Sequence, residues 1–190
     1  MLRNKLIVFS APSGAGKTTL VKHILSQNKN VSFSISATSR KPRGNEVDGV
    51  DYHFIDKEDF KKKIENNDFI EYEEVYDGVF YGTLKSVLEN IWDNNKVAIF
   101  DIDVVGGVNI KKMYPKNTIS IFVMPPSLET LKTRLINRGD IDEKEIKRRI
   151  EKAEKELDYA SFFDKIIINS DLEGSKSLVS KIVEEFLNNE

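Results

Sequence analysis

The most constraining feature of this sequence is a glycine-containing loop that lies between a short apolar run and an amphipathic segment. Residues 5–9 are rich in β-branched and apolar side chains, as in a strand, and residues 17–27 carry apolar side chains at helical spacing. Between them, residues 11–18 read Ala-Pro-Ser-Gly-Ala-Gly-Lys-Thr. Glycines let consecutive backbone N–H groups point inward at the start of a helix, where they hold phosphate. The strand–loop–helix context therefore predicts a loop that binds the phosphates of ATP or GTP.

Two side chains of this loop have expected chemical roles. In a nucleotide-binding loop of this kind, Lys17 bridges the β- and γ-phosphates and the Thr18 hydroxyl ligates Mg²⁺. The usual pattern G-x-x-x-x-G-K-[ST] opens with glycine, whereas this chain has Ala11 there. We expect a negative φ at Ala11, because alanine is strained at positive φ. An ordinary glycine-rich turn is the alternative. The residues expected to contact the nucleotide phosphates are Ala11, Pro12, Ser13, Gly14, Ala15, Gly16, Lys17, Thr18 and Thr19.

The same pattern of strand-like and helix-like segments recurs later in the chain. Compact apolar runs at residues 97–100, 119–123 and 165–168 read as strands, and residues 104–113 read as a helix between the first two. Strands that are apolar on both faces and separated by helices predict an α/β fold with a central parallel sheet flanked by helices. Further helices are expected over residues 57–66, 127–137 (capped by Ser127), 142–157 and 175–187.

Residues 32–83 have a different pattern of side chains from the rest of the chain. Aromatic, apolar and charged side chains alternate there, as in a small antiparallel sheet with one face exposed. We therefore expect a single domain with an inserted subdomain at about residues 32–83 and a core formed by about residues 1–31, 84–125 and 159–190.

Composition excludes several classes of function. A chain of 190 residues with 39% hydrophobic and 32% charged residues is expected to fold as one domain. Its 29 lysines and arginines nearly balance 31 aspartates and glutamates, so we expect no nucleic-acid partner. With no cysteine, a disulfide framework or thiolate metal site is excluded, and a cytoplasmic location is expected. No apolar run is long enough to suggest a membrane span.

Two carboxylates follow the predicted strand at residues 97–100. Ligands of open α/β sheets bind at the carboxyl ends of the strands, which is where Asp101 and Asp103 are expected. Asp101 is the natural carboxylate to act near Mg²⁺, indirectly, through water. For Asp103, the alternative is a simple N-cap of the helix that begins at Val104.

Several motifs along the chain, in order, resemble those of guanylate kinases, and the resemblance covers essentially the whole sequence. It implies a P-loop kinase fold with a GMP-binding insert and a helical lid at about residues 126–158. The motifs are residues 34–44 (Ser-Ile-Ser-Ala-Thr-Ser-Arg-Lys-Pro-Arg-Gly) with Glu46, Gly49 and Asp51-Tyr52-His53-Phe54; Phe69-Ile70-Glu71; Tyr81-Gly82-Thr83; Phe100-Asp101-Ile102-Asp103; Pro125-Pro126-Ser127; and Arg134 with Arg138-Gly139.

The resemblance also implies an activity and a set of site residues. The activity is transfer of a phosphoryl group from ATP to GMP, with Mg²⁺ and with dGMP as a further candidate substrate. Arginine forks and phenolic hydroxyls suit a phosphate dianion, and a carboxylate suits the two N–H donors of guanine. The implied phosphate ligands are Arg40, Arg43, Tyr52 and Tyr81; the base ligands are Glu71, Ser34, Thr83 and Asp103; and the catalytic cations are Lys17, Arg134, Arg138 and Arg149.

Other interpretations of these residues stay open at this point. The arginines could belong to solvated charged faces, the tyrosines could pack within strands, and Thr83 could only cap a helix. At the level of the whole chain, a non-catalytic interaction module of the same fold and a monophosphate kinase for another base are the alternatives.

Overall fold

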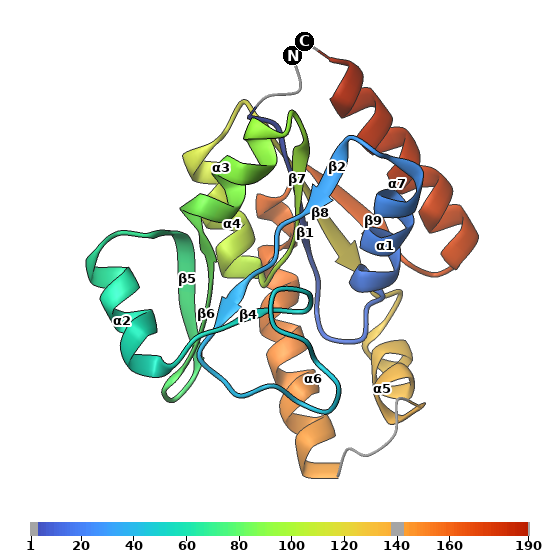
Figure 1. Cartoon of the computed structure of the whole chain (residues 1–190). Coiled ribbons are helices and arrows are strands. Elements are labelled where there is room, and N and C mark those ends of the chain that lie inside the picture. Colours follow the sequence, from blue (N-terminus) through green and yellow to red (C-terminus); the bar gives the residue numbers. More distant parts are fainter. Residues whose placement is uncertain (1–3, 138–142, 190) are drawn as a thin grey trace.

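A five-stranded parallel sheet forms the centre of the molecule in the computed structural model, which describes residues 4–137 and 143–189 (Figure 1). Neighbouring strands pair in parallel throughout this sheet. The middle strands are buried on both faces, which explains their continuous apolar runs. The strand order is β2 (Val31–Phe33), β7 (Val97–Asp101), β1 (Leu6–Ser10), β8 (Thr118–Met124) and β9 (Lys165–Ile168).

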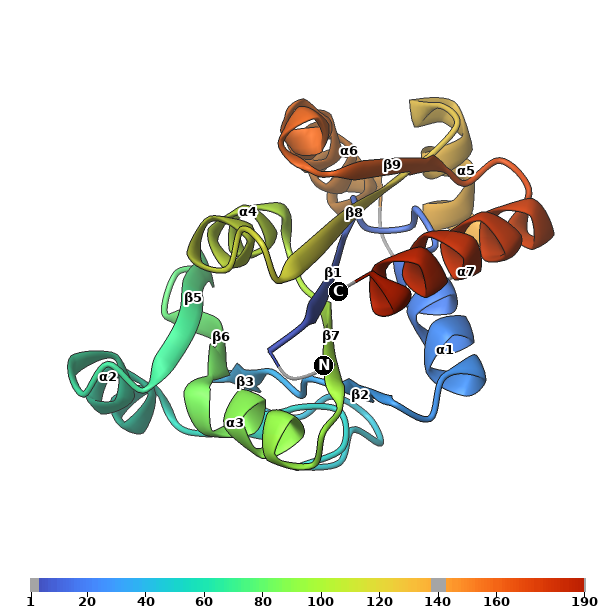
Figure 2. The ribbon, with the colours of Figure 1, turned by 90° about the horizontal axis from the view of Figure 1, so that it is seen from above.

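Helices cover both faces of this sheet, as the view from above shows (Figure 2). One face packs against α1 (Lys17–Gln27) and α7 (Leu172–Asn188), through buried side chains such as Leu20 and Val183. The other face packs against α3 (Lys85–Asp93) and α4 (Val104–Met113). The predicted α/β fold with a central parallel sheet is therefore confirmed.

A second, four-stranded sheet lies beside the first and belongs to the expected insert. Its strand order is β4 (His53–Phe54), β3 (Ala37–Thr38), β6 (Val79–Leu84) and β5 (Phe69–Tyr76), with α2 (Lys57–Glu65) packed on it. The stacked rings of Phe60, Phe69 and Phe80 form its small core. The expectation of an antiparallel sheet is corrected in one respect, because β3 and β4 pair in parallel.

The boundary between the core and the insert also differs from the expectation. Strand β2 pairs with β7 through Phe33, so residues 32 and 33 belong to the central sheet. The chain leaves this sheet at Ser34, whose backbone N–H donates to the carbonyl oxygen of Ile99.

Helices α5 (Leu128–Asn137) and α6 (Glu143–Leu157) form the region expected to act as a lid. They pack on each other through Leu131, Leu135 and Ala153. Ser127 caps α5 as predicted, since its hydroxyl accepts a hydrogen bond from the backbone N–H of Thr130 at 3.1 Å.

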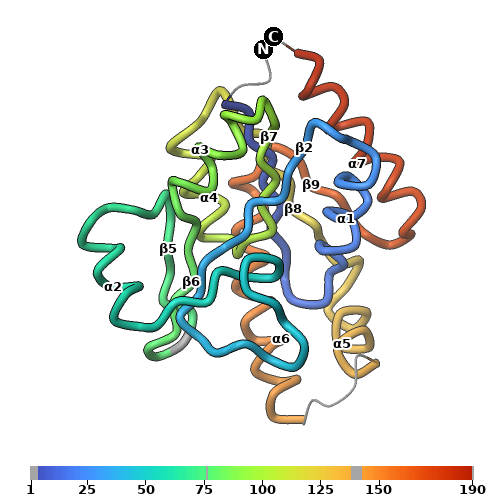
Figure 3. The backbone as a smooth tube through the Cα atoms, in the orientation of Figure 1, coloured from blue at the N-terminus to red at the C-terminus, as the bar shows by residue number. Residues whose placement is uncertain are grey.

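The two ends of the described chain meet on the side away from the insert (Figure 3). The Lys5 ammonium donates to the carbonyl oxygens of Phe186 and Leu187 near the end of α7, where a cation is favoured by the helix dipole. Helix α7 begins three residues earlier than predicted, because Asp171 caps it. Among the described helices, none combines the length and apolar character needed to cross a bilayer.

Candidate active site

The loop between β1 and α1 has the backbone geometry that phosphate binding needs. Gly14 and Gly16 have φ values of 94° and 98°, and Gly16 caps α1. A Cβ atom at Gly16 would lie 2.3 Å from the amide nitrogen of Asn169, so only glycine fits there. Ala11 is absent from the described non-glycine residues with positive φ, which confirms the expectation for it. The loop residues line a cavity of about 460 Å³, except Ala15, which is fully buried beneath them.

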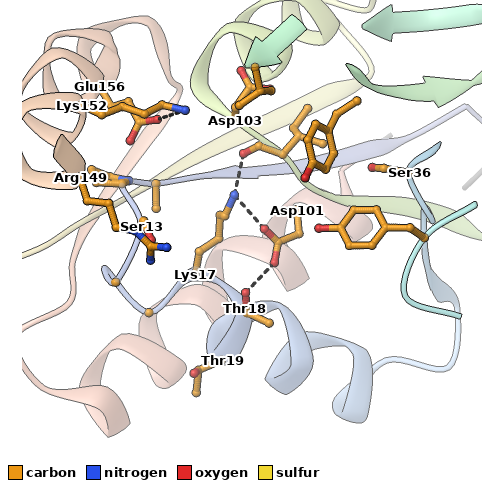
Figure 4. Close-up of a pocket in the computed structure, with 18 of the residues that line it drawn as sticks. Ser13, Lys17, Thr18, Thr19, Ser36, Asp101, Asp103, Arg149, Lys152 and Glu156 are labelled. Carbon is orange, nitrogen blue, oxygen red and sulfur yellow. Dashed lines mark hydrogen bonds and ion pairs between the residues drawn. The ribbon is translucent and has the colours of Figure 1, made fainter. Parts of the chain in front are cut away.

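Lys17, Thr18 and Asp101 meet at the carboxyl ends of β1 and β7 (Figure 4). The Lys17 ammonium lies 2.8 Å from one carboxylate oxygen of Asp101 and donates to the carbonyl oxygen of Ile102 at 2.7 Å. The Thr18 hydroxyl donates to the other Asp101 oxygen at 2.9 Å. Because β1 and β7 are adjacent and parallel, the two sequence segments arrive at the same edge of the sheet.

The predicted phosphate-binding side chains of the insert gather around one guanidinium group. Arg40 donates through Nε to the Tyr81 hydroxyl at 2.8 Å, and its carbon centre lies 4.9 Å from the centre of the Tyr52 ring. Its terminal nitrogens bind both oxygens of Glu46 at 2.6 and 2.8 Å. Glu46 also accepts from the backbone N–H of Arg43. The structure thus brings Arg40, Tyr52 and Tyr81 together, with Arg43 beside them on the cavity wall.

Glu46 has a role here that the sequence reasoning did not assign. Its hydrogen bonds from the Arg40 side chain and the Arg43 backbone lower the pKa of its carboxyl to about 2 and raise the pKa of Arg40. The sequence feature that could have identified Glu46 is its place within the motif, two residues beyond Gly44. The spacing did not indicate that Arg40 would be its partner.

The predicted base ligands converge on a buried carboxylate. Glu71 on β5 is only 7% exposed, and the Thr83 hydroxyl donates to its Oε1 at 2.7 Å. Burial, followed by the charge of Asp103, raises the pKa of Glu71 to about 7 despite the Thr83 hydrogen bond, which lowers it. A Cβ atom at Gly106 would lie 2.9 Å from Glu71 Oε2 and 3.3 Å from Asp103 Oδ2, so both carboxylates face the start of α4.

The capping alternatives have different outcomes. Asp103 does cap α4, since one of its oxygens accepts from the N–H groups of Val105 and Gly106 at 2.7 and 2.9 Å. Its other oxygen faces Glu71. Thr83 is not the N-cap residue of α3, because Leu84 occupies that position. Ser34 is buried, is not among the residues that line the cavity, and its hydroxyl has no hydrogen-bond partner among the described residues.

The lid arginines lie in different environments. Arg134 on α5 donates to the carbonyl oxygens of Asn169 at 2.9 Å and of Ala15 at 3.4 Å, which ties the lid to the phosphate loop. Arg149 on α6 lines the cavity and pairs with Glu145 at 2.9 Å. Arg138 lies outside the described residues.

Asn169 is a further residue that the sequence reasoning missed. It is 4% exposed, and its side-chain amide donates to the carbonyl oxygen of Ala15 at 2.8 Å. It follows the apolar run of β9 directly. A polar residue at the carboxyl end of a core strand was the signal that could have identified it.

Charged side chains of both signs line this cavity. The cations include Lys17, Arg43 and Arg149, and the carboxylates include Glu71 and Asp103. A phosphate loop at the edge of a parallel sheet, sharing one cavity with arginine and tyrosine side chains of the insert, defines a P-loop kinase that acts on a small phosphorylated substrate.

Comparison with known proteins identifies the family. The family model described as guanylate kinase matches residues 3–186. The guanylate kinase of Bacteroides thetaiotaomicron is 51% identical over 189 residues, covering 100% of this chain and 93% of that protein. The guanylate kinase of Porphyromonas gingivalis is 48% identical over 184 residues, covering 96% of this chain and 98% of that protein. The crystal structure of guanylate kinase from Anaplasma phagocytophilum superposes with a TM-score of 0.78 at 29% identity, covering 100% of this chain and 89% of that one. The chain belongs to the guanylate kinase family.

Proposed function

We propose that this protein transfers the γ-phosphoryl group of ATP to GMP, giving ADP and GDP. The observation that carries the proposal is the buried Glu71 carboxylate, placed with Asp103 on the same cavity as the phosphate loop. Guanine presents N1–H and a 2-amino group as donors, and ionised carboxylates accept both. Adenine has an acceptor at N1, so it would offer no donor there to the buried Glu71 carboxylate. Discrimination of this kind reaches the order of 10⁴-fold.

The donor nucleotide is held by the phosphate loop in this proposal. Backbone N–H groups at the start of α1 bind the ATP phosphates, and Lys17 neutralises charge on the β- and γ-phosphates. Arg134 keeps α5 against the loop through the carbonyl oxygens of Ala15 and Asn169.

The residues at the loop also fit Mg²⁺. The Thr18 hydroxyl and the Asp101 carboxylate are oxygen ligands within 2.9 Å of each other, and Mg²⁺ in kinases is commonly held by one or two such groups together with substrate phosphates. The described residues contain no cluster of three or more histidine, cysteine or acidic side chains that could hold a metal by themselves. When bound, Mg²⁺ would neutralise charge on the phosphate oxygens.

The phosphate of GMP is oriented by Arg40, Arg43, Tyr52 and Tyr81. One of its oxygens attacks the γ-phosphorus, and the bond from that phosphorus to the β–γ bridging oxygen breaks, which releases ADP. The attacking oxygen is already anionic near neutral pH, so no general base is needed. Catalysis then depends on positioning and charge neutralisation, to which Arg149 and Arg138 of the lid contribute. Closure of the lid and insert excludes water, which would otherwise accept the phosphoryl group.

The two alternative functions lack this support. An interaction module has no use for Lys17 and Thr18 held together by Asp101 beside the phosphate loop. A kinase for another base has no use for a buried carboxylate at Glu71. The setting we propose is the cytoplasm, whose reducing conditions suit a chain with no cysteine.

Measurement of ATP consumption with GMP, dGMP, AMP, UMP and dTMP in turn tests the proposal. We expect turnover with GMP, and kcat/KM for AMP lower by about 10³-fold or more. Measurable turnover with dGMP would show that the 2′-hydroxyl is not required. If GMP is not phosphorylated, or if AMP is used as well as GMP, the proposed function is wrong.

A further inference from the structure

Strand β1 ends in a serine whose side chain reaches the start of α4. Ser10 is fully buried, and its hydroxyl donates to the carbonyl oxygen of Asp103 at 2.8 Å. Ser10 directly precedes Ala11, the first residue of the phosphate loop. Asp103 caps α4 and lies with Glu71 beside the start of that helix. One hydrogen bond therefore joins the strand that carries the phosphate loop to a carboxylate residue of the proposed base site, and the mechanism above gives it no part.

Hydrogen bonds hold Asp103 from two directions. Its Oδ1 accepts from the backbone N–H groups of Val105 and Gly106, and its carbonyl oxygen accepts from the N–H of Gly107 at 3.0 Å. These bonds lie within the first turn of α4, so they fix Asp103 relative to its own helix. The bond from the Ser10 hydroxyl comes from outside that helix. It fixes Asp103 relative to the strand that leads into the phosphate loop.

The other side-chain contacts between the phosphate loop and this segment differ from the Ser10 bond in what nucleotide binding does to them. Lys17 and Thr18 each bind a carboxylate oxygen of Asp101. In the proposed function these two side chains serve the phosphates and Mg²⁺, so their contacts change during each turnover. Ser10 does not line the cavity, and its hydroxyl is shielded from the nucleotide. Its bond to Asp103 can therefore persist while the contacts of Lys17 and Thr18 are exchanged.

A glycine on α4 leaves the space that the Ser10 hydroxyl occupies. A Cβ atom at Gly107 would lie 2.6 Å from Ser10 Oγ and 3.1 Å from the nearest ring atom of Phe163. The first distance is too short for two such atoms, so Gly107→Ala would force the hydroxyl away from the carbonyl oxygen of Asp103. Gly107 thus provides a second way to disturb this hydrogen bond without replacing either of its partners.

We propose that Ser10 is a positioning residue for guanine recognition, because its hydroxyl holds Asp103 in a fixed position relative to the phosphate loop. The inference rests on the function proposed above. Glu71 can accept N1–H and one N–H of the 2-amino group, which leaves the second N–H of that group for Asp103, whose Oδ2 lies beside Glu71 Oε2 near Gly106. Loss of the Ser10 bond lets Asp103 shift, which weakens recognition of the 2-amino group more than recognition of N1–H.

A substrate analogue without the 2-amino group separates this role from a general structural one. Inosine monophosphate (IMP) keeps N1–H and the phosphate but has no 2-amino group, so its use should depend less on Asp103. Steady-state kinetics with GMP and with IMP, at saturating ATP, are measured for the wild type and Ser10→Ala. The wild type should prefer GMP by about tenfold or more. Ser10→Ala should lower kcat/KM about tenfold for GMP and about twofold for IMP, chiefly through KM, with the KM for ATP nearly unchanged.

Ser120→Ala is the matched control. Ser120 is 1% exposed on the neighbouring strand β8, does not line the cavity, and donates through its hydroxyl to Asp164 Oδ2 at 2.8 Å. This variant should lose stability in urea, because it removes a buried hydrogen bond, but keep the wild-type preference for GMP over IMP. Gly107→Ala should lower that preference as Ser10→Ala does. In the double variant the two effects should not add, because the hydroxyl that the new Cβ displaces is already absent.

Equal losses for GMP and IMP in Ser10→Ala, or no loss with either substrate, would overturn the positioning role and leave the kinase function intact. Additive effects in the double variant, or a wild type that uses IMP as well as GMP, would overturn it too. Failure of the wild type to phosphorylate GMP would instead overturn the proposed function together with this inference. If Ser10→Ala does not fold, Ser10→Cys, whose thiol is a weaker donor of similar shape, is measured in its place.

Discussion

Replacement of Glu71 by glutamine should make the ligand-free protein more stable above neutral pH. Burial raises the pKa of this carboxyl from 4.5 to about 7. Below pH 4.5 the carboxyl is protonated in both the folded and the unfolded chain. Between pH 4.5 and about 7 the folded chain keeps a proton that the unfolded chain has lost, so the free energy of unfolding falls as the pH rises. At about 1.36 kcal/mol per pH unit, the loss is about 3 kcal/mol once the pH exceeds 7.

Glutamine has nearly the same shape, accepts the hydrogen bond from Thr83 and stays neutral at every pH. We therefore expect Glu71→Gln and the wild type to have similar stability near pH 4.5, and the variant to be more stable by up to about 3 kcal/mol at pH 8. Its kcat/KM for GMP should fall about 100-fold, because an amide group replaces one of the acceptor oxygens that guanine needs with a donor.

Urea unfolding of both ligand-free proteins at several pH values from 4.5 to 8 measures the first effect, and steady-state kinetics with GMP measure the second. Glu89→Gln, at an exposed position on α3, controls for the loss of one negative charge and should leave the kinetics with GMP unchanged. A stability difference that does not widen with pH would refute the explanation based on burial. Unchanged GMP kinetics in Glu71→Gln would show that the base is recognised elsewhere.

Two further predictions concern the phosphate loop. Gly16→Ala should cost about 2–3 kcal/mol of stability, measured by urea unfolding, and most of the activity, because φ is 98° and the new Cβ would lie 2.3 Å from the Asn169 amide nitrogen. Gly44→Ala is the control, because φ is also positive there but nothing lies within 4 Å of the new Cβ. It should cost no more than about 1–2 kcal/mol. Equal losses at the two glycines would contradict this explanation. Lys17→Met should reduce turnover by about 10³-fold or more while the urea midpoint changes little, and retention of more than a tenth of the activity would remove Lys17 from the proposed mechanism.

Local patterns in the sequence were sufficient for much of the fold. The bounds of α1 and α4 were predicted correctly because helical spacing and flanking small or capping residues encode them within about ten positions. Strand β2 was missed because three residues are too few to show periodicity. The parallel pairing of β3 with β4 was missed because it depends on how distant segments meet in the folded insert. The early start of α7 was encoded, since Asp171 is a standard N-cap residue that the interpretation overlooked.

Some residues of the candidate site could likewise be predicted from local sequence, and others could not. Lys17 and Thr18 belong to a motif whose chemistry is encoded within eight residues, so the sequence alone indicated their roles. Asn169 and Glu46 take their roles from partners that only the folded chain brings near them. Such residues carry ordinary polar side chains in unremarkable local sequence, and neither periodicity nor composition distinguishes them.

Four cations in or beside the cavity already have carboxylate partners among the described residues. In the proposed function, substrate binding is therefore an exchange of partners, in which phosphate oxygens replace carboxylate oxygens around a cation. Such pairing lowers mutual repulsion among the cations and makes a stray anion compete with a carboxylate held nearby. The buried carboxylate has the opposite arrangement, because Glu71 and Asp103 lie together at the start of α4 and burial disfavours the charged form of Glu71. In the proposed function, guanine offers these carboxylates two donors, whereas adenine at the same site offers fewer. The selectivity for guanine would then depend on the unfavourable burial of Glu71 in the ligand-free protein. The cation–carboxylate pairs are Lys17–Asp101, Arg40–Glu46, Arg149–Glu145 and Lys152–Glu156.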